Sequence, residues 1–197
     1  MAQPALKPRP FGGNDLDFSG LRGRAAVISA GGRGIGQGEM GSFIGVTTAI
    51  AQFMRELERA WEAHQEALLV RRDLAAALAP LAAEPSVVHI PAMTGASGRP
   101  AVERFYADQF LPHVPGDLVL SKISRTVDRW RLVEETTVSF THDREIPWLL
   151  PGVAPTFRRA EVLAIAVVGF ERGRIRAQRV LWDHATLAGQ LGLGPEI

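Results

Sequence analysis

Hydrophobic side chains recur at three- and four-residue steps from Ile50 to Leu68, and charged side chains fill most of the positions between them. This spacing predicts one amphipathic helix of about five turns, with an apolar stripe that faces the core. Thr47 and Thr48 precede the pattern, and either hydroxyl is a suitable N-cap. We therefore expect the helix to begin at one of these two threonines.

The second half of the chain is rich in Val, Ile, Thr and Ser, which predicts strands. Short polar turns separate these strands, so neighbours along the chain are expected to pair antiparallel. Helices followed by antiparallel strands indicate an α+β fold, here a cone-shaped curved antiparallel sheet with helices packed on its concave side. Further helices are expected at residues 73–79 (capped by Asp73), 98–111 and 185–191, and strands at residues 86–90, 118–127, 131–142, 158–171 and 175–183.

The beginning of the chain shows no sustained hydrophobic period. Residues 1–46 are rich in Pro, Gly and small side chains, so we expect a poorly ordered leader before one domain at residues 47–197. Its first ten residues lack the apolar core of a secretory signal, and no apolar run is long enough to span a membrane. A cytoplasmic protein is therefore the expectation.

Composition narrows the function further. Of 197 residues, 22 are basic and 21 acidic, a net charge of +1 that gives no electrostatic reason to expect nucleic acid or an anionic membrane as a partner. Cysteine is absent, which excludes disulfides, thiolate metal sites and cysteine nucleophiles. A small molecule is the expected partner.

Several short strings within residues 48–193 are distinctive: residues 88–91 and 93–95, 105–106 with Phe110, 139–142, 150–156 and 182–183. Together they resemble the SnoaL-like polyketide cyclase family, a branch of the nuclear-transport-factor-2-like and ketosteroid-isomerase-like superfamily. The resemblance implies the cone-shaped fold, which hosts cyclases, isomerases, dehydratases, epoxide hydrolases and binding modules. One departure is Phe157, which stands where the family usually has glycine and is expected to narrow or cover the pocket mouth.

A glycine-rich segment at residues 31–36 resembles the phosphate-binding turn of short-chain dehydrogenases. The surroundings do not fit, because a dinucleotide site requires a parallel sheet and an acidic residue on the next strand. The Tyr-x-x-x-Lys pair of those enzymes is also missing, since Phe110 stands four residues after Tyr106. No cofactor is therefore expected.

Asp183 is the first candidate for chemistry. Odd-numbered positions of the strand at residues 175–183 share one face, so Asp183 is expected beside Leu181 in a partly desolvated place. Desolvation raises a carboxyl pKa toward neutrality, which suits a general acid and base. The resemblance implies the same role for an aspartate after the tryptophan. The alternative is that Asp183 only caps the helix at residues 185–191.

His142 is the second candidate for catalysis. It ends the strand at residues 131–142 and shares a face with Glu134, and a histidine beside an acid can hold a carbonyl oxygen. The alternative is a surface histidine next to Asp143. Glu134 itself is expected to be a buried partner in the pocket, or else to indicate that this face of the strand is more exposed to water.

Five further side chains are candidates for substrate binding together with Glu134. His64 and His89 lie on apolar elements, where a histidine is either a core residue or a pocket residue. Aromatic residues with polar tips can orient a flat polycyclic ligand, although a core role is the plainer interpretation. No pair of histidines has the spacing of a metal site, so no metal is expected. The set is His64, His89, Tyr106, Trp148 and Trp182.

The family resemblance implies two enzymatic functions for these candidates, and the apolar sheet adds a third possibility. The first is cofactor-independent general acid and base chemistry, an aldol-type cyclisation or isomerisation of an apolar oxygenated substrate such as a polyketide, with Asp183 moving the proton. The second is epoxide opening by two acids bridged by an arginine, for which Asp183, Arg179 and Glu134 are a loose match. The third is a non-catalytic binding module. The run from Val162 to Val168 is apolar on both faces, so a homodimer through the open sheet face is expected.

Overall fold

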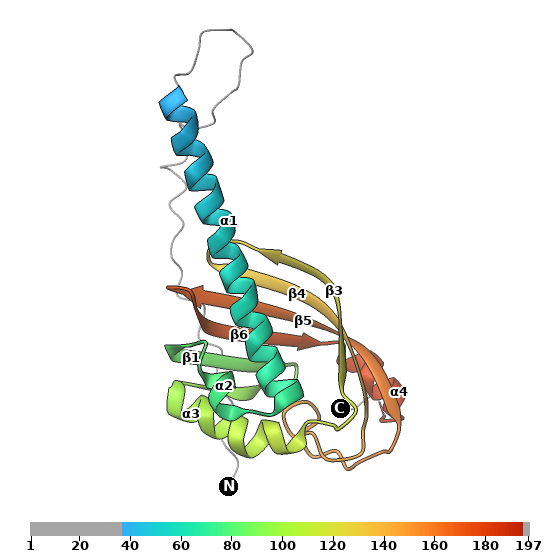
Figure 1. The fold of residues 1–197 in the computed structure, drawn as a ribbon. Helices are drawn as coiled ribbons and strands as arrows, with labels where there is room; N and C mark the ends of the chain where they lie inside the picture. Colours follow the sequence, from blue (N-terminus) through green and yellow to red (C-terminus); the bar gives the residue numbers. More distant parts are fainter. Residues whose placement is uncertain (1–36, 195–197) are drawn as a thin grey trace. The chain divides into compact units, whose positions relative to one another are not determined.

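The structure is a computed structural model that describes residues 37–194, with side chains from residue 48 onward (Figure 1). Contacts along the backbone divide the chain after Thr48, and the description below concerns the unit that begins at Ala49. The glycine segment at residues 31–36 lies outside the described residues. The elements are α1 (Gln37–Gln65), α2 (Leu74–Leu78), β1 (Leu81–Ile90), β2 (Thr94–Ser97), α3 (Arg99–Arg104), β3 (Val119–Val127), β4 (Arg131–Thr141), β5 (Arg159–Glu171), β6 (Arg174–Trp182) and α4 (His184–Leu191).

The six strands form one sheet in the order β2-β1-β6-β5-β4-β3. The four carboxyl-terminal strands pair antiparallel with their sequence neighbours, as predicted. β1 pairs antiparallel with β2 but parallel with β6, so the sheet is mixed rather than purely antiparallel. The parallel pair arises because α3 and four further strands separate β1 from β6 along the chain. The α+β class is confirmed.

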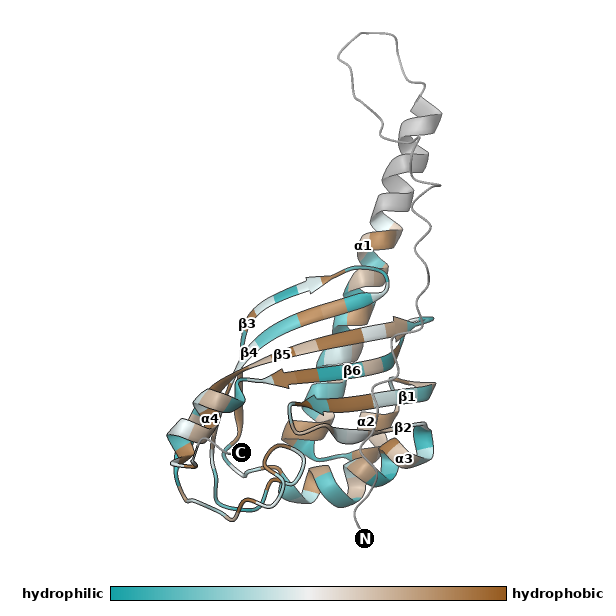
Figure 2. Ribbon diagram, turned by 180° about the vertical axis from the view of Figure 1, so that it is seen from behind, coloured by the Kyte–Doolittle hydropathy of each residue, from teal (hydrophilic) through white to brown (hydrophobic). Residues whose placement is uncertain are grey.

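The helices before β3 cover one face of the sheet, and α4 follows β6 at the far end of the strands (Figures 1 and 2). In β4 and β5 the buried residues alternate with more exposed ones, as expected when one sheet face packs against helices. Two helical stretches widen into π-helical turns, at Glu66–Arg71 after α1 and at Phe105–Phe110 after α3. Such turns are common at functional sites, and both carry residues of the cavity described below.

The prediction that α1 begins at Thr47 or Thr48 is wrong. The helix begins at Gln37, so both threonines lie within it. No proline interrupts residues 37–48, and nothing therefore stops the backbone hydrogen bonding from extending toward the amino terminus. The shorter helix after it agrees with the sequence, since the Asp73 side chain accepts a hydrogen bond from the Ala76 backbone N–H and caps α2.

The hairpin between β5 and β6 contains an irregularity that decides which side chains reach the site. Gly169 pairs with Ala177, whereas Phe170 pairs with Ile175, so one extra residue, Arg176, is inserted in β6. A bulge of this kind reverses the alternation of faces along the strand. Ile175 points inward before the bulge, and Gln178 points inward after it.

No helix among the described residues is long and apolar enough to cross a membrane.

Candidate functional site

A cavity lies between the helical layer and the covered face of the sheet. Its empty space is about 660 Å³ with the opening to solvent included. The described lining residues are Trp61, His64, Gln65, Leu68, Leu69, Val87, His89, Tyr106, Phe110, Leu118, Leu120, Thr136, Val138, Trp148, Ala164, Ala166, Gln178, Val180 and Trp182.

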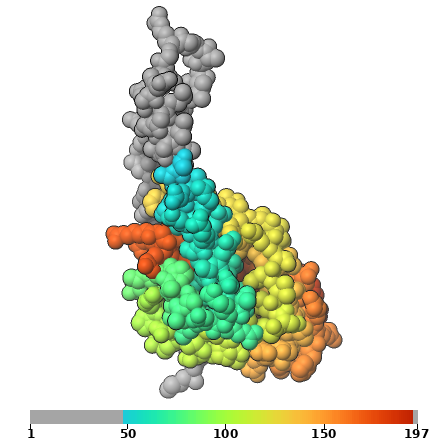
Figure 3. All heavy atoms as spheres, in the orientation of Figure 1, coloured from blue at the N-terminus to red at the C-terminus, as the bar shows by residue number. Residues whose placement is uncertain are grey.

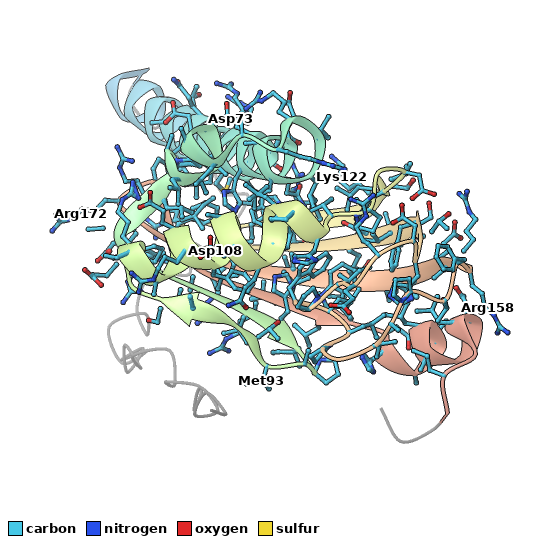
Figure 4. The ribbon with its side chains drawn as sticks, turned by 90° about the horizontal axis from the view of Figure 1, so that it is seen from below. Asp73, Met93, Asp108, Lys122, Arg158 and Arg172 are labelled. Carbon is cyan, nitrogen blue, oxygen red and sulfur yellow. The ribbon has the colours of Figure 1, made fainter. Side chains whose placement is uncertain are left out.

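This lining is apolar and contains no charged side chain among the described residues. Apart from the buried pair of Arg125 and Glu134, most charged side chains lie on the outside of the unit, and Figure 4 shows the labelled Lys122, Arg158 and Arg172 at its periphery. The side chains of α1, α2 and α3 close over the sheet on the face shown in Figure 3. An enclosed, uncharged cavity favours an uncharged ligand, because no opposite charge would compensate for the desolvation of an ion.

One end of the cavity holds a buried polar cluster of His64, Tyr106 and Gln178. His64, on the last turn of α1, donates from Nδ1 to the Ala77 carbonyl oxygen at 2.7 Å. Its Nε2 is therefore the acceptor in the neutral ring, and it accepts from the Gln178 amide at 2.9 Å. Burial lowers the pKa of His64 to about 4, although the bonds to Ala77 and Gln178 oppose the shift. His64 is thus neutral near pH 7.

The Tyr106 hydroxyl completes the cluster. It lies 3.3 Å from His64 Nε2 and accepts from the Gln178 amide nitrogen at 3.3 Å. Burial raises the pKa of Tyr106, so the phenol keeps its proton. The Tyr106 O–H has two acceptors within the cluster, His64 Nε2 at 3.3 Å and Gln178 Oε1 at 3.5 Å, and both distances are long for a hydroxyl donor.

The other end of the cavity is aromatic. The His89 ring stacks on Phe110 with centroids 5.7 Å apart and lies 5.3 Å from the Trp148 ring. The Trp182 indole donates from Nε1 to His89 Nδ1 at 3.3 Å. Burial lowers the pKa of His89 to about 3, and the ring is therefore neutral. The buried Nε1 of Trp148 has no hydrogen-bond partner among the described residues.

Five of the six predicted binding residues line the cavity: His64, His89, Tyr106, Trp148 and Trp182. The sixth, Glu134, does not. It is buried next to the cavity, where Arg125 donates to its Oε2, and Trp61 and Gln65 donate to its Oε1 at 3.0 and 2.9 Å. Glu134 therefore holds two lining residues in place instead of contacting a ligand, because both of its oxygens are occupied.

The prediction of Asp183 as a buried acid is wrong. Its side chain is exposed and accepts from the Thr186 backbone N–H at 3.1 Å as the N-cap of α4. Hydrogen bonds from the Thr186 side chain and backbone lower the pKa of Asp183, the opposite of the expected shift. The cause is the bulge at Arg176, which turns the even-numbered positions of β6 inward and Asp183 outward.

His142 is buried as its strand pattern predicted, but it does not line the cavity. It lies beyond the end of β4 under the segment at residues 150–157. Its Nδ1 lies 3.2 Å from the Thr156 hydroxyl and 3.3 Å from the Thr156 backbone nitrogen. Burial lowers the pKa of His142, with the charge of Asp143 opposing the shift. The residue holds a loop and has no access to the cavity, which corrects its expected catalytic position.

Phe157 also differs from expectation, since it is 74% exposed and does not line the cavity. Its φ is +57°, in the left-handed region that glycine adopts without a steric penalty. This backbone requirement accounts for the glycine that is usual at this place in the resembling family.

The pattern along the sequence missed Gln178 altogether. The alternation of β6 placed Gln178 on the outer face together with Val180, and the bulge that brings both inward has no clear signature in the sequence. Gln178 stands between Ala177 and Arg179, so apolar neighbours along the chain did not single it out. No group of three His, Asp or Glu side chains suitable for a metal ion occurs among the described residues.

Neither a family model nor a curated protein matches the sequence. The fold has clear counterparts among solved structures. A protein of Jannaschia sp. CCS1 assigned to the SnoaL-like polyketide cyclases has 14% identity and a TM-score of 0.60, over 73% of this chain and 96% of that one. An NTF2-like protein of unknown function from Burkholderia pseudomallei has 22% identity and a TM-score of 0.54, over 69% and 97%.

A third counterpart carries a different activity. An LEH-like epoxide hydrolase of M. tuberculosis has 18% identity and a TM-score of 0.51, over 70% of this chain and 90% of that one. The chain therefore has the α+β fold of these solved structures, which include an NTF2-like protein and a protein assigned to the SnoaL-like polyketide cyclases, as expected. The different activities of these counterparts mean that the fold by itself specifies no reaction.

Proposed function

We propose that the cavity binds an uncharged, largely apolar small molecule that carries a carbonyl group, and that His64 with Tyr106 performs cofactor-independent proton transfer on it. The observation that carries this proposal is the buried cluster of a neutral histidine, a protonated phenol and an amide at one end of an uncharged cavity. The fold supports the proposal to the extent that structural counterparts include SnoaL-like polyketide cyclases.

The proposed step is an enolisation. The bond from the Gln178 amide to His64 Nε2 has to open first, which frees the lone pair of the ring. A C–H bond next to the ligand carbonyl then breaks, its proton passes to His64 Nε2, and the electron pair moves to the carbonyl oxygen. The imidazolium that forms is stabilised by its Nδ1–H bond to the Ala77 carbonyl. Return of the proton to another carbon gives an isomer, whereas attack of the enolate on a second carbonyl gives a ring. A base with a pKa near 4 is weak, but such bases remove these protons when hydrogen bonds stabilise the enolate oxygen.

Deuterium exchange into 2-tetralone tests this proposal, because the ketone is flat and uncharged and has acidic protons next to its carbonyl. In D₂O at pD 7, proton NMR should show loss of the C1 signal about 10²-fold faster or more with the protein than without it. His64→Gln should abolish the acceleration, and His184→Gln, outside the cavity, should preserve it. Binding of 2-tetralone without faster exchange would refute catalysis.

A non-catalytic binding module is the second candidate, and the absence of any carboxylate from the described cavity lining favours it. Epoxide opening is less well supported. The acids bridged by an arginine are Glu62 and Glu134 with Arg125, instead of the expected set with Asp183 and Arg179. None of the three lines the cavity, and both oxygens of Glu134 are engaged, so the set has no place for an attacking water.

We also propose that a second copy of the chain covers the outer face of the sheet. Exposed apolar side chains from three adjacent strands, Val133, Leu163 and Leu181, lie on that face. Their burial in a dimer would remove them from water. Leu163→Glu should give a monomer in size-exclusion chromatography with light scattering, while Val70→Glu should not change the wild-type mass. A monomeric wild type would contradict the proposal.

A further inference from the structure

His89 and Trp182 fix which hydrogen-bonding group the aromatic end of the cavity presents. An indole N–H is a donor with no acceptor capacity. The bond from Trp182 Nε1 to His89 Nδ1 therefore requires a lone pair on Nδ1. A neutral imidazole carries a single N–H, so that proton is on Nε2. The tautomer of His89 is the opposite of that of His64, whose Nδ1 is protonated.

The surroundings of His89 keep it neutral. Four aromatic rings lie within 6.3 Å of its ring centroid, those of Phe105, Phe110, Trp148 and Trp182. Desolvation by these apolar neighbours lowers its pKa to about 3, and no acidic side chain opposes that shift. The ring thus offers a donor without a positive charge, which suits a neutral oxygen better than a carboxylate. A neutral imidazole with a lowered pKa is able to polarise a carbonyl group.

The donor on His89 has no acceptor within the described protein. No hydrogen bond to Nε2 is present among the described residues, and His89 lines the cavity. The adjacent Trp148 holds a second N–H without a partner. A ligand that supplies an acceptor oxygen can form a hydrogen bond with the His89 donor, whereas an apolar ligand of the same shape cannot, and the Trp148 N–H carries the cost of a buried donor without an acceptor.

We infer that His89 is a specificity-determining residue that binds a ligand carbonyl oxygen through Nε2–H, and that Trp182 is a positioning residue that fixes this tautomer. The inference rests on the proposed binding of a small molecule and adds the polarity of its oxygen group. A flat ketone is the preferred ligand. The corresponding hydrocarbon has the same shape but cannot form the hydrogen bond, so it binds with lower affinity.

Titration with 9-fluorenone and fluorene tests the inference, since the two guests differ by a carbonyl in place of a methylene group. The ratio of the fluorene Kd to the fluorenone Kd in the wild type is compared with the same ratio in His89→Phe, which cancels the difference in hydrophobicity. We expect the ratio to fall about tenfold in His89→Phe. Trp182→Phe keeps an aromatic ring and should lower the ratio less, while the exposed Trp130→Phe should leave it unchanged.

Imidazole nitrogen NMR provides a readout that a packing role would not move. Long-range ¹H–¹⁵N spectra at pH 7 should show His89 protonated at Nε2 in the wild type and a mixture of tautomers in Trp182→Phe. A wild-type His89 protonated at Nδ1 would overturn the inference. So would an unchanged Kd ratio in His89→Phe with both guests bound, which leaves the proposed function standing. If neither guest binds, the proposed function fails, and the spectra still decide the tautomer.

Discussion

Glu134 offers the sharpest stability test, because one carboxylate connects the sheet to the helix that lines the cavity. Its side chain is 2% exposed and that of Arg125 is 8% exposed. Glu134→Gln keeps the shape of the side chain but removes the charge. Breaking a buried ion pair on one side costs about 3–5 kcal/mol. Arg125 retains its bond to the half-exposed Glu62 at 2.6 Å, so we expect the lower end, about 3 kcal/mol.

For a unit of this size, a loss of about 3 kcal/mol lowers Tm by about 6–12 °C. Far-UV circular dichroism during heating, with urea unfolding as a second measurement, gives this value. Glu135→Gln is the matched control, since the neighbouring carboxylate faces the other way and bonds the exposed Ser124 hydroxyl. The control should change stability by no more than about 0.5 kcal/mol.

Removal of both charges separates the ion pair from simple packing. Arg125→Met combined with Glu134→Gln should lose less stability than the sum of the single changes, because no buried charge is left unpaired. Glu134→Gln should also weaken fluorenone binding, since Trp61 and Gln65 lose the charged acceptor that orients them. A Tm for Glu134→Gln equal to that of Glu135→Gln would refute the reasoning.

Three further changes test other parts of the structure. Burial lowers the pKa of His64 to about 4 and that of His89 to about 3, whereas both values lie near 6.5 in the unfolded chain. Below pH 6.5 the unfolded chain therefore binds more protons than the folded protein, and the stability of the fold decreases as the pH falls. Each histidine should contribute a loss of about 2 kcal/mol by pH 5, and urea unfolding of His64→Gln should show a shallower pH dependence than the wild type. Asp183→Ala should lower Tm slightly because it removes the N-cap of α4, whereas Asp183→Asn keeps the cap. Titration with fluorenone should give the wild-type Kd for both variants. A loss of affinity would show that Asp183 contributes to the binding site. Phe157→Gly should raise stability by up to about 1 kcal/mol in thermal unfolding, because glycine relieves the left-handed backbone conformation at little cost in burial; a clear loss would show that the exposed ring contributes packing.

The sequence predicted the fold well where local patterns control structure. The alternation in β4 placed Leu132, Glu134 and Val138 on the buried face, and all three are buried. Turn chemistry also located the β5–β6 hairpin, where Arg172 and Gly173 adopt the positive φ angles of a tight two-residue turn. In both places each residue's conformation is set by its immediate neighbours, so a short window of sequence carries the information.

The candidate site depended on features that are not local. The bulge at Arg176 forms where β6 pairs with β5. Because of it, Gln178 and Trp182 face the cavity, and Asp183 does not. A prediction that assumes strict alternation of inward and outward side chains along a strand cannot include such an insertion. The role of Glu134 likewise depends on Arg125, which lies on the neighbouring strand, and on Trp61 from a helix 73 residues away.

The crystal structure of the protein soaked with 9-fluorenone tests the central claim most directly. The account predicts the guest inside the cavity, its rings against Phe110 and Trp148, with the ketone oxygen within hydrogen-bond distance of His89 Nε2 or the Tyr106 hydroxyl. A cavity closed by its own side chains, or a guest whose oxygen faces the apolar wall, would contradict it.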